Sequence, residues 1–149
     1  MTIRLADPAE TEALGARLAV LLRAGDVVAL SGELGAGKTT FARGLLRALA
    51  FEGDVVSPTF PIVVAYEPPE TRLPLWHVDL FRIEQPGEID ELALSDARLD
   101  SALLIEWPER LGTALWPDAL RLRIDTVGEG VRALTAQVPP AWGDRWPPR

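Results

Sequence analysis

Apolar positions in the first third of the chain follow helical and strand spacing in turn. Between residues 11 and 23 they recur at helical intervals, which predicts an amphipathic helix with Asp7 or Thr11 as its cap. Residues 26–30 form a short apolar run rich in β-branched side chains, which predicts a strand. Helical spacing returns between residues 39 and 50, at Phe41, Ala42, Leu45, Leu46 and Leu49. The pattern therefore predicts a helix, a strand and a second helix, in that order.

The middle of the chain changes to strand spacing. Residues 62–66 and 73–80 predict two strands, and the turn of proline and acidic residues at 67–70 favours a hairpin. Residues 86–94 begin with proline and carry an apolar stripe, which is typical of a helix. The continuously apolar run 102–105 predicts a strand that is buried on both faces of a sheet.

The last third of the chain predicts a short helix and a closing hairpin. The helix is expected at residues 109–115, and the hairpin strands at 120–124 and 131–138, around a turn at 127–130. The remaining residues, 139–149, are rich in proline and tryptophan, and we do not expect them to form regular structure.

Length and composition favour one domain with a tail. A chain of 149 residues, of which 48% are hydrophobic, is long enough to bury a single core. We predict one domain over residues 1–138, followed by a tail at 139–149. Two interpretations stay open for Trp142 and Trp146 in the tail: packing against the body, which we favour, or a site for a partner.

Cysteine content and charge narrow the function classes. The chain has no cysteine, which excludes disulfides and thiolate chemistry. Nothing resembles an export signal or a membrane span, so we expect a cytoplasmic protein without membrane contact. A net charge of −7 argues against a broad surface for DNA or RNA, and we expect any role with RNA to be indirect. A local basic patch of Arg43, Arg47 and Arg82 stays open.

The most specific chemistry lies at residues 32–39, where GELGAGKT matches the phosphate-binding pattern G-x-x-x-x-G-K-[ST] at every required position. A predicted strand precedes the motif and a predicted helix follows it, as a phosphate-binding loop requires. Lys38 is the only lysine in the chain. Its compact ammonium suits the β- and γ-phosphate oxygens of a nucleotide better than a planar guanidinium does. Backbone N–H groups and the helix start would bind the same phosphates, and Thr39 would offer a hydroxyl to magnesium.

Two carboxylates are candidates for the second part of such a site, at the carboxyl end of a neighbouring strand. Glu106 directly follows the run 102–105, where it would hold the metal or polarise the attacking water. The alternative is a solvated glutamate at a strand end. Asp79 follows another apolar stretch, and it either reaches the metal or the water, or caps the next turn. Both interpretations of Asp79 stay open.

Other polar residues are less specific. Ser57 and Thr59 flank Pro58, and they form either a switch loop that senses the γ-phosphate or an ordinary turn. His77 is the only histidine of the chain, and we interpret it as a structural residue rather than a base.

The motif and its flanks together predict the fold class. We expect an α/β fold of the P-loop NTPase type, a three-layer sandwich. Its central sheet would be mixed and mainly parallel, with an antiparallel pair at the C-terminal end.

Five segments together resemble the bacterial TsaE family in order and spacing. They are residues 32–44, 57–60, 77–82, 91–92 and 105–109. The resemblance implies a small ATPase that works with the partner proteins TsaD and TsaB. Their product would be threonylcarbamoyl on the adenosine beside the anticodon, in tRNAs that read codons beginning with A.

The resemblance also implies roles for single residues. Magnesium would lie on Thr39 and Glu106, ATP phosphates on the loop, and a further nucleotide contact near Thr11. The implied ATP-binding set is Thr11, Glu33, Leu34, Gly35, Ala36, Gly37, Lys38, Thr39 and Thr40. The predicted catalytic residues are Lys38, Glu106 and Asp79. Trp107 matches a further position associated with activity.

Competing functions stay open. A small-molecule kinase usually has an arginine-rich lid, whereas Arg72, Arg82 and Arg98 are widely spaced. A GTPase is disfavoured because the chain has no asparagine for the guanine-reading motif N-K-x-D. The third alternative is a nucleotide-gated binding module, in which the shape with ATP bound matters more than turnover.

Overall fold

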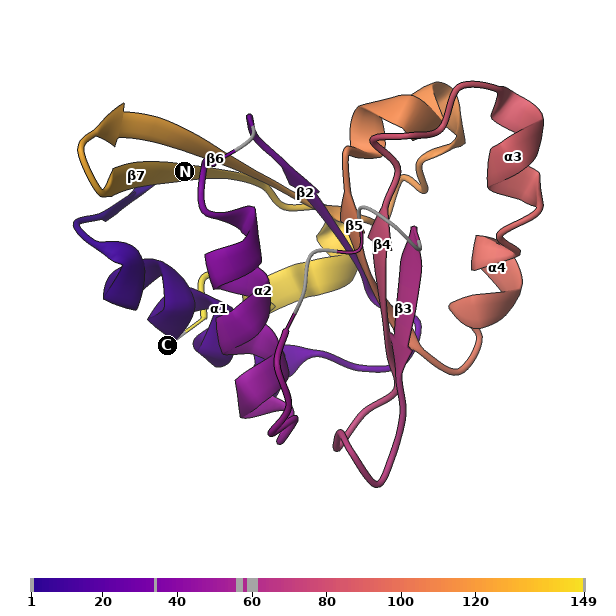
Figure 1. Cartoon of the computed structure of the whole chain (residues 1–149), viewed down its shortest axis with the longest axis horizontal. Coiled ribbons are helices and arrows are strands. Elements are labelled where there is room, and N and C mark those ends of the chain that lie inside the picture. Colours follow the sequence, from indigo (N-terminus) through magenta and orange to yellow (C-terminus); the bar gives the residue numbers. More distant parts are fainter. Residues whose placement is uncertain (1, 34, 56–57, 59–61, 149) are drawn as a thin grey trace.

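The computed structural model describes residues 2–33, 35–55, 58 and 62–148. Among these residues, seven strands form one sheet in the order β1-β7-β6-β2-β5-β4-β3, shown in Figure 1. The strands are β1 (Thr2–Leu5), β2 (Val27–Ser31), β3 (Val63–Tyr66), β4 (Leu75–Asp79), β5 (Ala102–Glu106), β6 (Leu120–Gly128) and β7 (Val131–Gln137). The helices are α1 (Pro8–Leu21), α2 (Lys38–Ala48), α3 (Pro86–Asp90), α4 (Leu94–Ala97) and the 3-10 helices η1 (Pro108–Ala114) and η2 (Pro140–Arg145).

The centre of the sheet is parallel and its edges are antiparallel. β2 runs parallel to β5 and β6, and β5 runs parallel to β4. β3 pairs antiparallel with β4, and β7 pairs antiparallel with both β6 and β1. The predicted fold class is confirmed, together with the 62–80 hairpin and the C-terminal antiparallel pair.

Two hydrophobic cores lie on opposite faces of the sheet and make the fold three-layered. Side chains alternate along a strand, so Val28 and Leu30 of β2 join the core under α1 and α2. Val27 and Ala29 join the second core, under α4 and η1. Every residue of β5 is buried, as predicted for a strand covered on both faces.

Helices α1 and α2 approach each other closely at two glycines. A Cβ on Gly44 would lie 1.9 Å from the backbone oxygen of Glu12, and one on Gly15 would lie 2.2 Å from that of Phe41. Only glycine fits at these crossing points. Asp7 caps α1 by accepting a hydrogen bond from the Glu10 N–H, so Asp7 is the cap and Thr11 is not. Thr11 is instead buried within the helix.

β1 and the helix expected at residues 86–94 differ from the sequence-based predictions. β1 was not predicted, because its segment has four residues and only Ile3 and Leu5 are apolar; it forms by pairing with β7 and burying Leu5. The predicted helix 86–94 is wrong in its extent. α3 ends at Asp90, and Ala93 takes a left-handed conformation (φ 53°) before α4 begins. The reversal turns the apolar residues of α4 toward the sheet.

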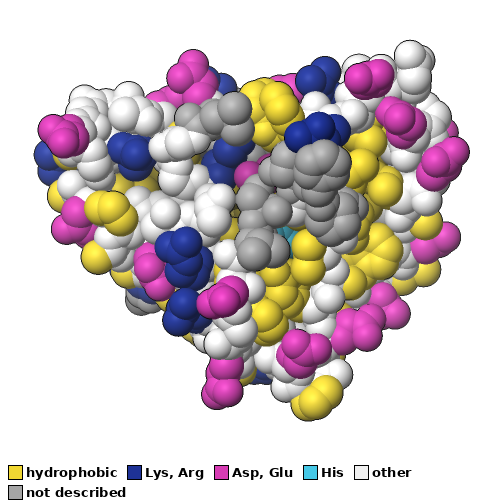
Figure 2. Space-filling model, viewed as in Figure 1, with side chains coloured by type: hydrophobic (Ala, Val, Ile, Leu, Met, Phe, Trp, Pro, Cys, Tyr) yellow, Lys and Arg dark blue, Asp and Glu magenta, His cyan; other side chains and the backbone are white. Residues whose placement is uncertain are grey.

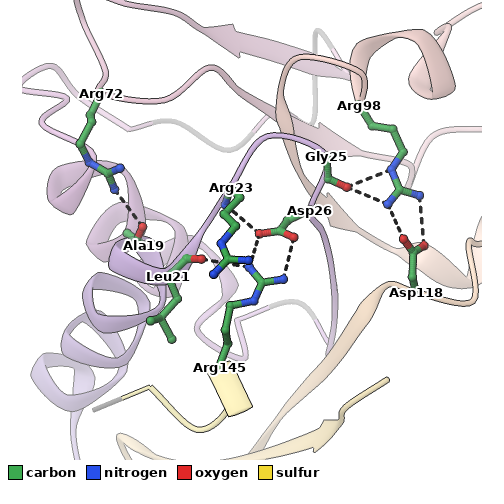
Figure 3. A network of polar contacts seen from close by, with 9 residues as sticks. All are labelled: Ala19, Leu21, Arg23, Gly25, Asp26, Arg72, Arg98, Asp118 and Arg145. Atoms are coloured by element: carbon green, nitrogen blue, oxygen red, sulfur yellow. Dashed lines mark hydrogen bonds and ion pairs between the residues drawn. The ribbon is translucent and has the colours of Figure 1, made fainter. Parts of the chain in front are cut away.

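The tail folds back onto the body. The expectation that it has no regular structure was wrong, because Pro140–Arg145 forms η2. Trp142 and Trp146 are buried in the core under α1 and α2, which confirms the packing interpretation. Figure 3 shows how Arg145 reaches the body: it contacts both carboxylate oxygens of Asp26 at 2.7 and 3.0 Å and donates to the Leu21 oxygen.

The surface carries charges of both signs. On the face in Figure 2, basic side chains occur in separate groups among acidic ones, without a continuous basic area over the described residues. In the part of the chain that the structure describes, no helix is long and apolar enough to cross a membrane.

Candidate functional site

The phosphate loop joins β2 to α2, as the motif predicted. β2 ends at Ser31 and α2 begins at Lys38. Gly37 has φ 104°, and Gly32 has φ 146° in a place where a Cβ would lie 2.5 Å from the Ile124 oxygen. Residues with a side chain rarely adopt these conformations, so both glycines are required by the loop's winding. Leu34 lies outside the described residues.

Lys38 is buried at the mouth of this loop, with 6% of its surface exposed. Its Nζ donates to the Gly32 oxygen at 2.7 Å and lies 4.5 Å from the ring centre of Trp107. Among the described residues, the ammonium is therefore held by a loop carbonyl and an indole face rather than by a carboxylate. Such contacts can be exchanged for phosphate oxygens without breaking an ion pair.

A cavity of about 400 Å³ opens beside the loop. It is lined by Gly35, Gly37, Lys38, Thr39, Thr40, Asp79, Phe81, Glu106, Trp107 and Arg132. The structure thus brings most of the predicted site residues to one place. Of the others, Glu33 is exposed, and Ala36 is buried beneath the loop.

Thr11 lies next to the loop although it comes from α1. Its methyl group is 3.8 Å from the position that a Cβ on Gly37 would take. Its hydroxyl oxygen is buried and has no hydrogen-bond partner among the described residues. An unpaired buried hydroxyl beside a phosphate loop agrees in place with the predicted nucleotide contact.

The two carboxylates sit side by side at the carboxyl ends of neighbouring parallel strands. Asp79 of β4 is in register with Glu106 of β5, and both are nearly buried, with 4% and 3% exposed. Asp79 Oδ1 accepts a hydrogen bond from the Phe81 N–H at 2.9 Å, so the predicted capping role is present. Asp79 also lines the cavity, together with Glu106.

Glu106 has a partner that sequence reasoning missed. His77 Nε2 lies 2.6 Å from Glu106 Oε2, and the histidine is fully buried. His77 Nδ1 has no partner among the described residues. The sequence held no signal for this contact, because the two residues are 29 positions apart and meet only through the pairing of β4 with β5.

Trp107 closes the cavity in a strained backbone conformation. Its φ of 56° and ψ of 50° lie in the left-handed region, which a bulky residue rarely occupies. The indole packs against Phe81, with ring centres 4.8 Å apart. It also contacts the Lys38 ammonium. This backbone conformation places the Trp107 indole directly beside the Lys38 ammonium.

Arg132 of β7 is a second residue that the sequence did not predict. Its Nε donates to the Ala36 oxygen at 2.8 Å and its Nη2 to the Gly35 oxygen at 3.1 Å. An arginine on a hairpin strand carries no motif, so only the folded sheet brings it to the loop. It adds a second positive charge to the cavity.

The two hydroxyl residues of the possible switch loop, Ser57 and Thr59, lie outside the described residues. A second cleft of about 410 Å³ lies on the opposite face of β2, between the sheet and η1. It contains Arg121 and Arg123 but neither the phosphate loop nor the carboxylate pair, so we assign the candidate site to the first cavity.

Comparison with known proteins places the chain in a family. Residues 5–134 match the family model described as "Threonylcarbamoyl adenosine biosynthesis protein TsaE". The chain belongs to the TsaE family. A relative from Streptomyces coelicolor, named tRNA threonylcarbamoyladenosine biosynthesis protein TsaE, is 45% identical over 135 residues, covering 89% of this chain and 91% of that protein. A Bacillus subtilis protein of the same name is 35% identical, covering 89% and 82%.

A solved structure confirms the fold of this TsaE-family chain. The crystal structure of Bacillus subtilis YdiB superposes with a TM-score of 0.75 at 31% sequence identity. The match covers 91% of this chain and 83% of YdiB.

Proposed function

We propose that this TsaE-family protein is an ATPase of low intrinsic activity that binds Mg-ATP in the phosphate-loop cavity. The observation that carries the proposal is the convergence of Lys38, Thr39 and Glu106 on one cavity beside the loop. A cation, a hydroxyl and a carboxylate are the groups that phosphoryl transfer requires around a nucleotide.

The residues present suit magnesium. The Thr39 hydroxyl and the carboxylates of Glu106 and Asp79 are hard oxygen ligands. Within the described residues, no group of three or more His, Cys, Asp or Glu side chains is arranged to hold a metal ion. This fits magnesium, which is usually held by one or two carboxylates together with substrate phosphates. When bound, the ion neutralises charge on the phosphates.

The chain's own residues supply the remaining chemistry. Lys38 exchanges the Gly32 oxygen for phosphate oxygens, and the loop N–H groups and the start of α2 bind the same phosphates. Glu106 or Asp79 orients and polarises the attacking water, because both line the cavity at the sheet edge. Trp107 and Phe81 shield that edge from solvent.

We further propose a place for this ATPase in tRNA modification. With TsaD and TsaB, in the cytoplasm, it supports formation of N6-threonylcarbamoyladenosine beside the anticodon of tRNAs that read codons beginning with A. Family membership and the names of the relatives support this role. The net charge of −7 supports an indirect relation to the tRNA.

A nucleotide-gated binding module is the second candidate, and one contact favours it. Lys38 lies on Trp107 in this structure, so withdrawal of the ammonium to a nucleotide would remove a support of a strained residue. A partner would then read the changed Trp107 region. Both candidates use the same site and differ in whether turnover is needed.

Replacing Lys38 tests the loop. We expect Lys38→Ala to lose ATP binding in calorimetry and to lose support of tRNA modification in a reconstituted reaction with TsaD and TsaB. Arg47→Ala is the control, because it removes a cation from the exposed end of the same helix. Full nucleotide affinity in Lys38→Ala would discredit the loop assignment.

Replacing Glu106 separates binding from turnover. We expect Glu106→Ala to keep Mg-free ATP binding, while hydrolysis falls by about 100-fold or more, since it removes a metal ligand or a group that positions water. The rate of phosphate release at saturating ATP is measured for the wild type and for Glu106→Ala. Normal hydrolysis in Glu106→Ala would show that Glu106 has no role in turnover and only marks the end of β5. Lost hydrolysis with normal tRNA modification would favour the binding module.

A further inference from the structure

The buried pair of His77 and Glu106 is not accounted for by the phosphate loop. Alternation along β4 and β5 places His77, Asp79 and Glu106 on the sheet face that α2 covers. Register pairs His77 with Leu104 and Asp79 with Glu106. The His77 and Glu106 side chains therefore meet diagonally across the two strands, with Nε2 and Oε2 2.6 Å apart.

We infer that His77 is a positioning residue that holds the Glu106 carboxylate in place for a divalent cation. The inference rests on the proposed function, because it assigns Glu106 to magnesium. Carboxylates that bind metals are commonly fixed by a hydrogen bond from a neighbouring group, and loss of such a group costs about 10- to 100-fold in metal affinity or activity.

The hydrogen bonds of the pair support this role. When a carboxylate is ionised it can only accept, and the hydrogen bond at this contact then runs from His77 Nε2–H to Glu106 Oε2. None of the described residues engages the other carboxylate oxygen, Oε1. Glu106 itself lines the cavity. One oxygen is thus held by His77 while the other remains available to a cation.

The His77–Glu106 pair is not explained by a contribution to the stability of the fold. His77 is fully buried, yet its Nδ1 has no partner among the described residues, and an unpaired buried polar atom is unfavourable. Burying a histidine and a carboxylate together also removes their hydration. An apolar side chain of similar volume at position 77 would avoid the unpaired Nδ1, but it would leave the nearly buried Glu106 carboxylate without its partner. The histidine is therefore better explained by its effect on Glu106 than by packing.

The test measures how nucleotide binding depends on the metal. ATP binding is titrated with Mg²⁺, and ATP affinity is measured separately in EDTA. In His77→Leu, we expect the half-saturating Mg²⁺ concentration to rise about 10-fold or more, with unchanged ATP affinity in EDTA. His77→Gln keeps an N–H donor and should restore part of the difference.

A control separates positioning from loss of stability. Thr71→Val removes a buried hydrogen bond to the Leu73 oxygen in the loop that joins β3 to β4. It should lower stability without moving the Mg²⁺ midpoint. If Thr71→Val and His77→Leu raise the midpoint equally, the effect is structural and the inference is overturned.

Glu106→Gln distinguishes failure of this inference from failure of the proposed function. An unchanged Mg²⁺ midpoint in Glu106→Gln would remove Glu106 from the metal site, and so would overturn both this inference and the proposed role of Glu106 as a metal ligand. A raised midpoint in Glu106→Gln with a normal one in His77→Leu would overturn the positioning role alone. If His77→Leu does not fold, His77→Ala, which also lacks the N–H donor, carries the test, with the EPR spectrum of bound Mn²⁺ and ATP. An unchanged spectrum and midpoint in that variant count against the role.

Discussion

At the scale of single residues, the loop depends on contacts that its own motif does not contain. Gly35 and Ala36 turn their oxygens toward Arg132, which donates to both. Trp107 supports the Lys38 ammonium from the other side. When the N–H groups of a loop face a nucleotide, its carbonyl oxygens need hydrogen-bond donors from elsewhere in the protein. Here Arg132 of β7, far away in the sequence, is that donor.

The first prediction concerns Arg132. Arg132→Ala should lower ATP affinity about fivefold, because the loop loses two charge-assisted hydrogen bonds, a loss of about 1 kcal/mol. Calorimetric titration with ATP measures the change. Arg121→Ala is a suitable control, since Arg121 is exposed on the neighbouring strand β6 and does not line the cavity. Equal affinity in the wild type and Arg132→Ala would show that the loop keeps its shape unaided.

A second residue-scale prediction concerns pH. Figure 3 shows Arg98 joined to Asp118, and their hydrogen bonds hold the pKa of Asp118 below its ordinary value of 3.8. A carboxylate with a lowered pKa stabilises the fold above its unfolded pKa, and this contribution disappears as the pH falls through the folded pKa. Wild type should therefore exceed Asp118→Asn in melting temperature at pH 7, and the difference should vanish in acid.

The expected size of that difference is small. Asp118 is partly exposed, and exposed ion pairs contribute up to about 1 kcal/mol. The measurement is a pair of thermal denaturation series over pH, one for each protein. A difference that stays constant down to the acid limit would contradict an electrostatic origin.

At the scale of elements, close contact between α1 and α2 sets the position of the phosphate loop. A Cβ at Gly44 would overlap the Glu12 backbone oxygen, which cannot move aside as a flexible side chain does. Because α2 begins at Lys38, any separation of the two helices also shifts the end of the loop. Element packing and the site are thereby coupled.

The third prediction follows from this contact. Gly44→Ala should destabilise the protein by about 2 to 3 kcal/mol, as expected for overpacking, although alanine favours helices. Gly87→Ala in α3 is the control, because nothing lies within 4 Å of the added Cβ. Urea unfolding of both variants measures the difference. Equal stability of the two variants would mean that α1 moves away without penalty.

At the scale of the whole molecule, the tail ties separate parts of the fold together. Arg145 of η2 contacts Asp26, just before β2, and the Leu21 oxygen at the end of α1. Its guanidinium also lies 4.1 Å from the ring centre of Trp142. The tail therefore links the first helix to the strand that leads into the phosphate loop.

The fourth prediction tests this link. Arg145→Ala should cost about 2 kcal/mol of stability, because it leaves a mostly buried Asp26 carboxylate without its charged donor. Arg123→Ala removes an exposed pair with Asp125 and should change stability by less than about 1 kcal/mol. Chemical unfolding curves compare the two. A larger loss in Arg123→Ala would contradict the importance of the tail.

The sequence predicted the elements that depend on local order. Helical and strand spacing located α1, β2, α2 and β5, and the loop motif located Lys38 at the start of α2. The rule that parallel strands end at one sheet edge predicted that Asp79 and Glu106 would face the loop. These features depend on the spacing of apolar residues and on the backbone preferences of residues that are close together in the sequence.

The sequence by itself determined the phosphate loop, the parallel centre of the sheet and the resemblance to the TsaE family. Tertiary structure alone decided the pairing of β1 with β7, the packing of the tail, and the contacts of His77 with Glu106 and of Arg132 with the loop. Each joins segments far apart in the chain. Their free energy comes from burial and hydrogen bonds that exist only once the sheet is assembled, and no local pattern records them.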